Sequence, residues 1–226
     1  MPPENNPLTL LIKIVLMLLP VLLAACGKVG PQTDAQAPRP APSCEACTHT
    51  ISGYDEAIYA LSGGEVICIT ASGHFAGRIN RATGDGPTLI CNKGLFQPVL
   101  ISLHAGSVQI DNYGIFRPGA VNLSPRNTRT LINNHPGAEF RPGAFNLHGA
   151  GNEFHNYGTF SPARFSMASG ALFINYPGGI TTTDLFSLRQ KARAINQGAW
   201  TLHETIDRDG SSSLQNEGQL QMTHKR

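Results

Sequence analysis

The sequence predicts an all-β fold, a single-stranded right-handed parallel β-helix of about eight coils with a repeat of 19–23 residues. Three observations support this: a recurring Asn-x-Gly motif, apolar positions that alternate along each repeat, and a composition rich in turn formers. The chain of 226 residues contains 24 Gly and 16 Pro, and only 14% of its residues are charged. Such a composition favours short strands joined by turns over long helices.

The motif consists of an asparagine, one or two residues, a glycine, and an aromatic or apolar residue two positions later. Consecutive asparagines are 20, 22, 22, 19, 21 and 20 residues apart. We expect each asparagine to lie at a tight corner between two strands, where it tolerates a positive φ angle. Stacked corners would join the side-chain amides from coil to coil in a ladder. The expected members are Asn92, Asn112, Asn134, Asn156, Asn175, Asn196 and Asn216.

Apolar residues two positions apart follow each motif, a spacing typical of strands with one inward face. The pairs are Ile101/Leu103, Val121/Leu123, Phe145/Leu147 and Phe165/Met167, with a looser Leu185. The motif aromatics should stack inside the coils: Phe75, Phe96, Phe116, Phe140, Phe160 and Trp200. Two or three short strands therefore fit each repeat. Parallel crossovers are nearly always right-handed, which sets the expected hand.

Over residues 66–222 the chain resembles the right-handed β-helix superfamily that includes pectate lyases and many bacterial surface proteins. The resemblance rests on the stacking period and the corner asparagines. It implies an architecture and transfers no activity, so it assigns no catalytic residue, metal or cofactor.

The amino-terminal segment has the anatomy of a secretory leader, with an apolar run from Ile14 to Ala25 that ends in Leu-Ala-Ala-Cys. This ending resembles the bacterial lipobox. The resemblance implies that residues 1–25 are removed as a signal peptide and that Cys26 carries lipid, which anchors the protein without spanning the membrane. Gly27 follows the cysteine where inner-membrane lipoproteins carry Asp, which implies the outer membrane. The alternative is an ordinary secretory signal in which Cys26 is incidental.

Three regions follow the leader. Residues 26–43 begin with the lipidated cysteine and continue as a Pro- and Ala-rich tether, residues 44–65 form an amino-terminal cap region, and residues 66–226 form the β-helix. The net charge of +2 comes from intermixed acids and bases, so nucleic acid is not an expected partner.

Four cysteines remain after Cys26: Cys44, Cys47, Cys68 and Cys91. An even number in an exported chain predicts disulfides, and four cysteines allow three connectivities. The Cys44-x-x-Cys47 spacing also fits a redox or zinc site, but no second CxxC motif or βαβ context accompanies it.

The residues after the corner asparagines suggest a ligand-binding edge. If this position points outward, Tyr113, His135, Tyr157 and Tyr176 line one edge of the coils, where sugar rings could stack on them. Arg117 and Arg141 would lie in adjacent coils and hold an anion or an acidic sugar. The competing interpretation is that the aromatic residues only cover the corner and that the arginines pair with nearby carboxylates.

These patterns favour a non-enzymatic envelope or surface lipoprotein, structural or adhesive, whose partners are the membrane through its lipid and a glycan or another envelope protein. The alternative is a pectinase-like polysaccharide lyase or hydrolase that uses Asp111, Glu153 or Arg141. A third interpretation, a redox or assembly factor, would use Cys44 and Cys47.

Overall fold

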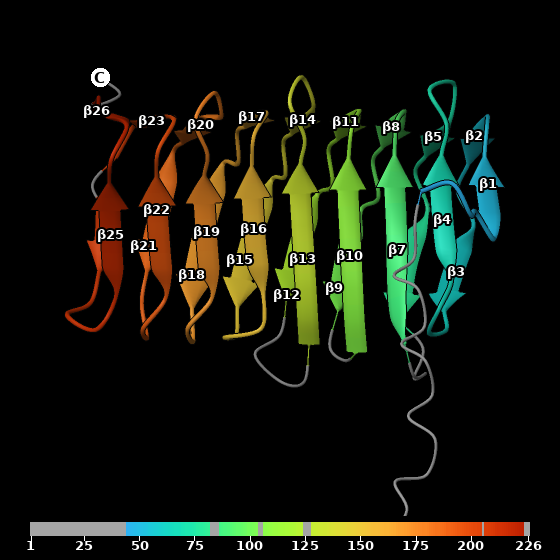
Figure 1. The fold of residues 1–226 in the computed structure, drawn as a ribbon, viewed down its shortest axis with the longest axis horizontal. Helices are drawn as coiled ribbons and strands as arrows, with labels where there is room; N and C mark the ends of the chain where they lie inside the picture. Colours follow the sequence, from blue (N-terminus) through green and yellow to red (C-terminus); the bar gives the residue numbers. More distant parts are fainter. Residues whose placement is uncertain (1–43, 82–85, 104–105, 124–127, 205, 224–226) are drawn as a thin grey trace, which may run out of the picture. The chain divides into compact units, whose positions relative to one another are not determined.

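The computed structural model describes residues 44–81, 86–103, 106–123, 128–204 and 206–223, and these fold into a parallel β-helix (Figure 1). Its three sheets contain nine, nine and eight strands, which makes eight complete coils and two strands of a ninth. The predicted fold class and coil number are confirmed. In Figure 1 the chain rises along the front sheet and descends behind it while advancing from right to left, which is a right-handed coil. Within the described ranges, no helix is long and apolar enough to cross a membrane.

Each complete coil contributes one strand to each sheet. Sheet A consists of β1 (His49–Ile51), β4 (Val66–Ile69), β7 (Pro87–Asn92), β10 (Gly106–Asn112), β13 (Thr128–Asn134), β16 (Glu153–Asn156), β19 (Leu172–Asn175), β22 (Arg193–Asn196) and β25 (Ser213–Asn216). Sheet B consists of β2 (Tyr54–Asp55), β5 (His74–Phe75), β8 (Leu95–Phe96), β11 (Ile115–Phe116), β14 (Glu139–Phe140), β17 (Thr159–Phe160), β20 (Ile180–Thr183), β23 (Ala199–Leu202) and β26 (Gln219–Met222). Sheet C consists of β3 (Ile58–Leu61), β6 (Arg78–Arg81), β9 (Leu100–Leu103), β12 (Ala120–Leu123), β15 (Ala144–His148), β18 (Arg164–Ala168), β21 (Leu185–Leu188) and β24 (Ile206–Arg208).

Equivalent residues of successive coils pair in parallel register, so each repeat position becomes a row along the stack. The predicted aromatic row is buried, and the rings of Phe96 and Phe116 stack at a centroid distance of 4.6 Å, as do those of Phe116 and Phe140. Thr181 takes this position between Phe160 and Trp200. The prediction that Leu185 points into the core is wrong by one residue. Leu185 is 38% exposed, and Phe186 occupies the core position in register with Phe165.

The seven corner asparagines end consecutive strands of sheet A and form a continuous ladder of hydrogen bonds. Each of the first six donates from Nδ2 to Oδ1 of the next, over distances of 2.6–2.8 Å. Asn92 also donates to the carbonyl of Ile115, and Asn112 to that of Glu139. The first six side chains are fully buried, so the ladder satisfies amides whose isolation would be costly.

The expected positive φ angle at these asparagines is wrong. Among the described residues, the non-glycine residues with positive φ are Ser169, Gln190 and Lys191, which lie at the turn between sheets C and A. The ladder, not backbone strain, therefore explains the asparagines. The glycine of the motif is needed for space instead: a Cβ on Gly114 would lie 2.4 Å from the carbonyl oxygen of Gly94 in the preceding coil.

The segment 44–65, expected as a cap region, contains β1, β2 and β3 and so builds the first coil. Its strands pair with β4, β5 and β6 of the second coil in the same parallel manner as later coils. The predicted leader, tether and Cys26 lie outside the described residues.

The ladder gives a direct stability test. Asn156→Ala removes a fully buried amide that accepts from Asn134 and donates to Asn175, and leaves both neighbours partly unsatisfied. We expect the free energy of unfolding, measured by urea denaturation, to fall by about 3 kcal/mol. Asn216→Ala is the matched control: Asn216 is exposed and has a ladder neighbour on one side only, so its loss should cost about 1 kcal/mol. Equal losses for the two variants would contradict this role of the ladder.

Candidate functional site

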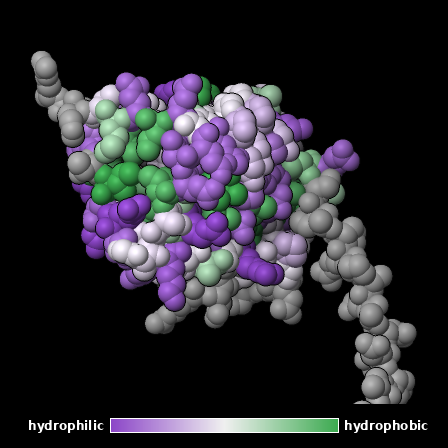
Figure 2. All heavy atoms as spheres, turned by 60° about the vertical axis from the view of Figure 1, so that its left-hand side comes forward, coloured by the Kyte–Doolittle hydropathy of each residue, from purple (hydrophilic) through white to green (hydrophobic). Residues whose placement is uncertain are grey.

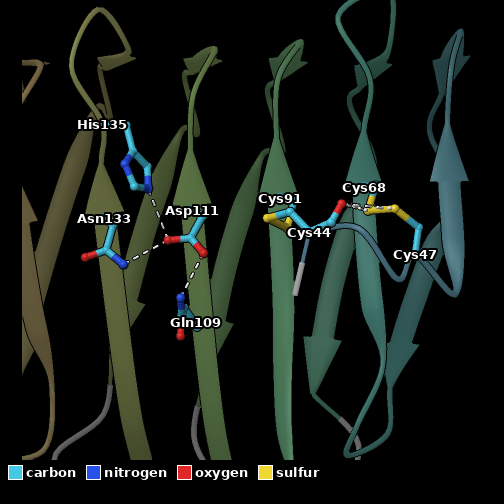
Figure 3. Close-up of a disulfide and its surroundings, with 8 residues drawn as sticks. All are labelled: Cys44, Cys47, Cys68, Cys91, Gln109, Asp111, Asn133 and His135. Carbon is cyan, nitrogen blue, oxygen red and sulfur yellow. Dashed lines mark hydrogen bonds and ion pairs between the residues drawn. A yellow bond between two sulfur atoms is a disulfide. The ribbon is translucent and has the colours of Figure 1, made fainter. Parts of the chain in front are cut away.

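Two disulfides fasten the segment before β1 across the outer face of sheet A (Figure 3). Cys44 is bonded to Cys91 in β7, and Cys47 to Cys68 in β4. Thr48 continues the attachment, because its backbone N–H and its hydroxyl both donate to the carbonyl of Val66. Cys44 and Cys47 do not pair with each other, so the CxxC motif supplies one cysteine to each of two separate disulfides. A redox role would need a free dithiol at this position, and both cysteines are already bonded.

Asp111 is in register with Cys91 of the Cys44–Cys91 disulfide, on the outer face of sheet A, and is 7% exposed. Gln109 Nε2 donates to one carboxylate oxygen and Asn133 Nδ2 to the other, each at 2.8 Å (Figure 3). His135 Nε2 lies 3.3 Å from Oδ1 of the same carboxylate. The carboxylate is thus held by side chains of its own and the next coil, and it serves to fix that surface in place.

The predicted aromatic edge forms two stacked pairs. The rings of Tyr113 and His135 are parallel with centroids 4.0 Å apart, and those of Tyr157 and Tyr176 are parallel at 4.2 Å. Burial raises the pKa of Tyr113, with a contribution from the Asp111 charge, and burial also raises the pKa of Tyr157. Each ring therefore covers one face of its partner, and the edge offers fewer free ring faces to a sugar than four separate aromatics would.

Arg117 and Arg141 do lie in adjacent coils, but a carboxylate joins them. Arg117 donates to Glu139 Oε1 from Nη2 at 2.8 Å and from Nε at 3.0 Å, and Arg141 Nε lies 2.7 Å from the same oxygen. This cluster carries a net single positive charge. Both arginines therefore follow the competing interpretation, in which they pair with a nearby carboxylate.

The residues of the pectinase-like alternative are not brought together. Asp111 and Glu153 belong to β10 and β16 of sheet A, with β13 between them, whereas Arg141 directly follows β14 of sheet B. Glu153 Oε2 lies 3.2 Å from His155 Nε2, although without the geometry of a hydrogen bond. In the part of the chain that the structure describes, no group of three or more His, Cys, Asp and Glu side chains could hold a metal ion.

The outer face of sheet C carries a groove that the repeat pattern alone does not predict. It has a volume of about 460 Å³ and runs across β15, β18, β21 and β24. The side chains that line it are those of Ala144, Asn146, Arg164, Phe165, Ser166, Leu185, Phe186, Ser187, Glu204 and Asp207.

A row of short polar side chains runs along the outer face of sheet C, and its members from Asn146 to Asp207 form the floor of this groove. Asn122, Asn146, Ser166, Ser187 and Asp207 occupy equivalent positions in successive coils, because β12, β15, β18, β21 and β24 pair in register. Coils of a parallel sheet are about 4.8 Å apart, so the row presents one hydrogen-bonding group per coil along the stack. Asn146 Nδ2 donates to Asn122 Oδ1 at 2.6 Å, which orients the first two members of the row.

Charged side chains flank the polar row. The Asp207 carboxylate forms an ion pair with Arg189. Arg164 and Glu204 are exposed at the rim, and neither has an ion-pair partner among the described residues. His148 Nε2 lies 3.3 Å from Ser166 Oγ, and burial lowers the pKa of this histidine, so it is neutral at pH 7. The groove therefore combines neutral hydrogen-bonding groups with one free cation and one free anion at its rim.

The signal for this row was present in the repeat. Asn122, Asn146 and Ser166 are the residues enclosed by the predicted core pairs, and period-two alternation places them outside. Short polar residues are also typical of ordinary solvent-exposed positions. Only the coil-to-coil register shows that they adjoin.

Comparison of the chain with protein-family models, curated proteins and solved structures finds no match in any of the three.

Proposed function

We propose that this protein is a non-enzymatic, lipid-anchored protein of the bacterial envelope that binds a glycan chain in the groove of sheet C. The observation that carries the proposal is the row of amide, hydroxyl and carboxylate groups repeated from coil to coil along the groove floor. A polysaccharide is the partner whose hydroxyl groups recur at regular intervals and can meet such a row.

The groove walls fit the same class of ligand. Leu185 is 38% exposed beside the floor and supplies an apolar surface for the C–H face of a sugar ring. Arg164 at the rim would attract a carboxylate or phosphate on an acidic sugar. The volume of about 460 Å³ lies in the range of small-ligand sites, enough for a short stretch of a longer chain.

A polysaccharide-cleaving enzyme is the second candidate, because Glu204 and Asp207 both line the groove. Glycoside hydrolysis requires an acid and a base or nucleophile that act as a pair. Asp207 is engaged by Arg189, which leaves Glu204 as the free carboxylate of the lining. This arrangement favours binding over cleavage.

Export to an oxidising compartment is supported by the two disulfides, which persist outside the cytoplasm. The lipid anchor at Cys26 and the outer-membrane location rest on the leader sequence, which lies outside the described residues.

Binding in the groove can be tested with Ser187→Trp, which fills the floor of the groove with a large side chain. The probes are immobilised acidic and neutral bacterial polysaccharides. We expect the unaltered protein to bind at least one of them and the variant to lose at least about tenfold in affinity. Ser161→Trp, on the sheet B side of the coils, is the matched control and should bind normally. Equal binding by both variants, or no glycan bound by the unaltered protein, would refute the proposal, and release of soluble fragments would support the enzyme instead.

The anchor is tested in cells with Cys26→Ala. The unaltered protein should incorporate labelled palmitate and sediment with membranes, because acyl chains bury many CH₂ groups at about 0.8 kcal/mol each. The variant should incorporate no label and appear in the soluble envelope fraction. A soluble, unlabelled parent protein would show that the leader is an ordinary secretory signal.

A further inference from the structure

The two ends of the coil stack differ in what they present. In the first coil, His49, Asp55 and Tyr59 stand in register with the core residues Ile67, Phe75 and Ile79 of the second. Tyr59 donates its hydroxyl to Asp55 at 2.6 Å, and the backbone N–H of Ala57 donates to the same carboxylate at 2.8 Å. Polar and hydrogen-bonded side chains therefore stand at three inward positions of this end, beside the buried Ile51 and Leu61.

At the opposite end, the terminal strands β24, β25 and β26, together called the last coil, carry apolar residues at most of the corresponding inward positions. Arg208, in register with the buried Leu188, is a charged exception. Ile206, Leu214, Leu220 and Met222 are in register with Phe186, Ala194, Trp200 and Leu202, all buried one coil earlier. The first three are only partly buried against the core, and Met222 is 51% exposed. Figure 2, which turns this end forward, shows hydrophobic surface interrupting the hydrophilic surface.

Unused hydrogen-bonding groups accompany this apolar surface. β24, β25 and β26 are the terminal strands of their sheets, so in the described structure each has one edge without a neighbouring strand. Asn216 is the last member of the ladder, and its Nδ2 donates to the carbonyl of Gly218 in its own turn at 3.2 Å. An apolar edge of this kind is a template for pairing with another strand.

We propose that the last coil is the interface of a symmetric dimer, in which the ends of two copies of this chain meet about a two-fold axis. An axis normal to sheet A sets β25 antiparallel to its counterpart and extends the sheet across both copies. Leu214 then faces Leu214 of the second copy, Leu220 faces the Ile206 side of the second copy, and these side chains are removed from water.

Stacking of the last coil on the first coil of another copy fits less well. Continuation of the register would set Leu220 against Asp55, and Arg208 against Leu61. Each contact would remove a charged group from water against an apolar side chain, which is unfavourable. The polar residues of the first coil thus disfavour head-to-tail polymers, and the two-fold dimer is the remaining arrangement.

Charge complementarity supports the two-fold arrangement. The axis brings the turn between sheets C and A onto the turn between sheets A and B of the second copy. Arg208 ends β24 at the first of these turns and is exposed, and Glu217 lies in the second. Each dimer would therefore contain the Arg208–Glu217 contact twice.

Asp209, next to Arg208 in the chain, does not occupy the Arg208 side chain. Asp209 Oδ2 accepts a hydrogen bond from the backbone N–H of Gln190 at 2.7 Å, and Oδ1 accepts from Ser211 and Ser212. These bonds, chiefly the one from Gln190, lower the pKa of Asp209 to about 2. Its carboxylate remains ionised but is directed to its own turn and the preceding coil, and among the described residues it forms no ion pair with Arg208.

Sedimentation equilibrium of the complete processed protein in mild detergent tests the proposal. We expect the mass of two chains, and we expect Leu214→Lys to weaken association at least about tenfold. Ile58→Lys, on the exposed surface of the first coil, should leave the dimer intact. A monomer at every concentration, or a series of larger polymers, would overturn the proposal, whatever the glycan assay shows.

A charge exchange separates the interface from simple loss of folding. Arg208→Glu and Glu217→Arg should each weaken the dimer about tenfold, and the double variant should restore it. Circular dichroism would verify that all three variants remain folded. Single variants that leave the dimer unchanged, or a double variant weaker than either, would rule out this two-fold contact.

Discussion

The register between successive coils is the constraint on which the other features of this structure depend. Parallel strands can slip, and a slip of one residue would turn every inward side chain outward. The asparagine ladder opposes a slip because a shifted coil would leave buried amides without partners at every step. Rows of apolar side chains on the inner faces of all three sheets favour the same register, so the polar and apolar interactions specify one arrangement.

Register also converts a repeated sequence position into a continuous surface. Asn146, Ser166 and Ser187 are unremarkable singly, but in register they form the floor of a groove. The same principle produces the stacked aromatic pairs at the corner and the Arg117–Glu139–Arg141 cluster. Such a row stabilises the surface when its members use their hydrogen-bonding and charged groups on one another, and it can bind a ligand when some of these groups stay unused. The aromatic and arginine rows are largely self-satisfied, whereas the groove row retains open hydrogen-bonding capacity.

Much of the fold could be predicted from the sequence because the residues that determine the fold recur at regular spacings. The spacing of the asparagines, the core pairs and the motif aromatics each reports a local pattern that stacking repeats. Leu185 is misplaced because Thr181 replaces the motif aromatic from which the core position is counted, and apolar residues occupy both 185 and 186. The positive φ expected at the asparagines was wrong because two functions of this residue type, conformational tolerance and amide pairing, are indistinguishable in sequence.

The candidate site was less predictable because it depends on contacts between coils. The pairing of Cys44 with Cys91 joins residues 47 positions apart, and cysteine spacing alone allowed three connectivities. The engagement of Arg117 and Arg141 by Glu139 required knowing that all three meet on one face. Sheet C illustrates the same limit: alternation predicted which residues point outward, but not that their neighbours leave a groove above them.

Removal of one complete coil tests the account most directly. Deletion of residues 157–175 joins Asn156 to Tyr176 and preserves the ladder, the core rows and the order of the sheets. Circular dichroism and urea denaturation should show a β-rich protein that unfolds cooperatively with reduced stability, because each repeat interacts mainly with its neighbours. Deletion of residues 157–166 alone breaks the register and should prevent folding. If the shorter deletion folded as well as the complete one, coil register would not be what holds this structure together.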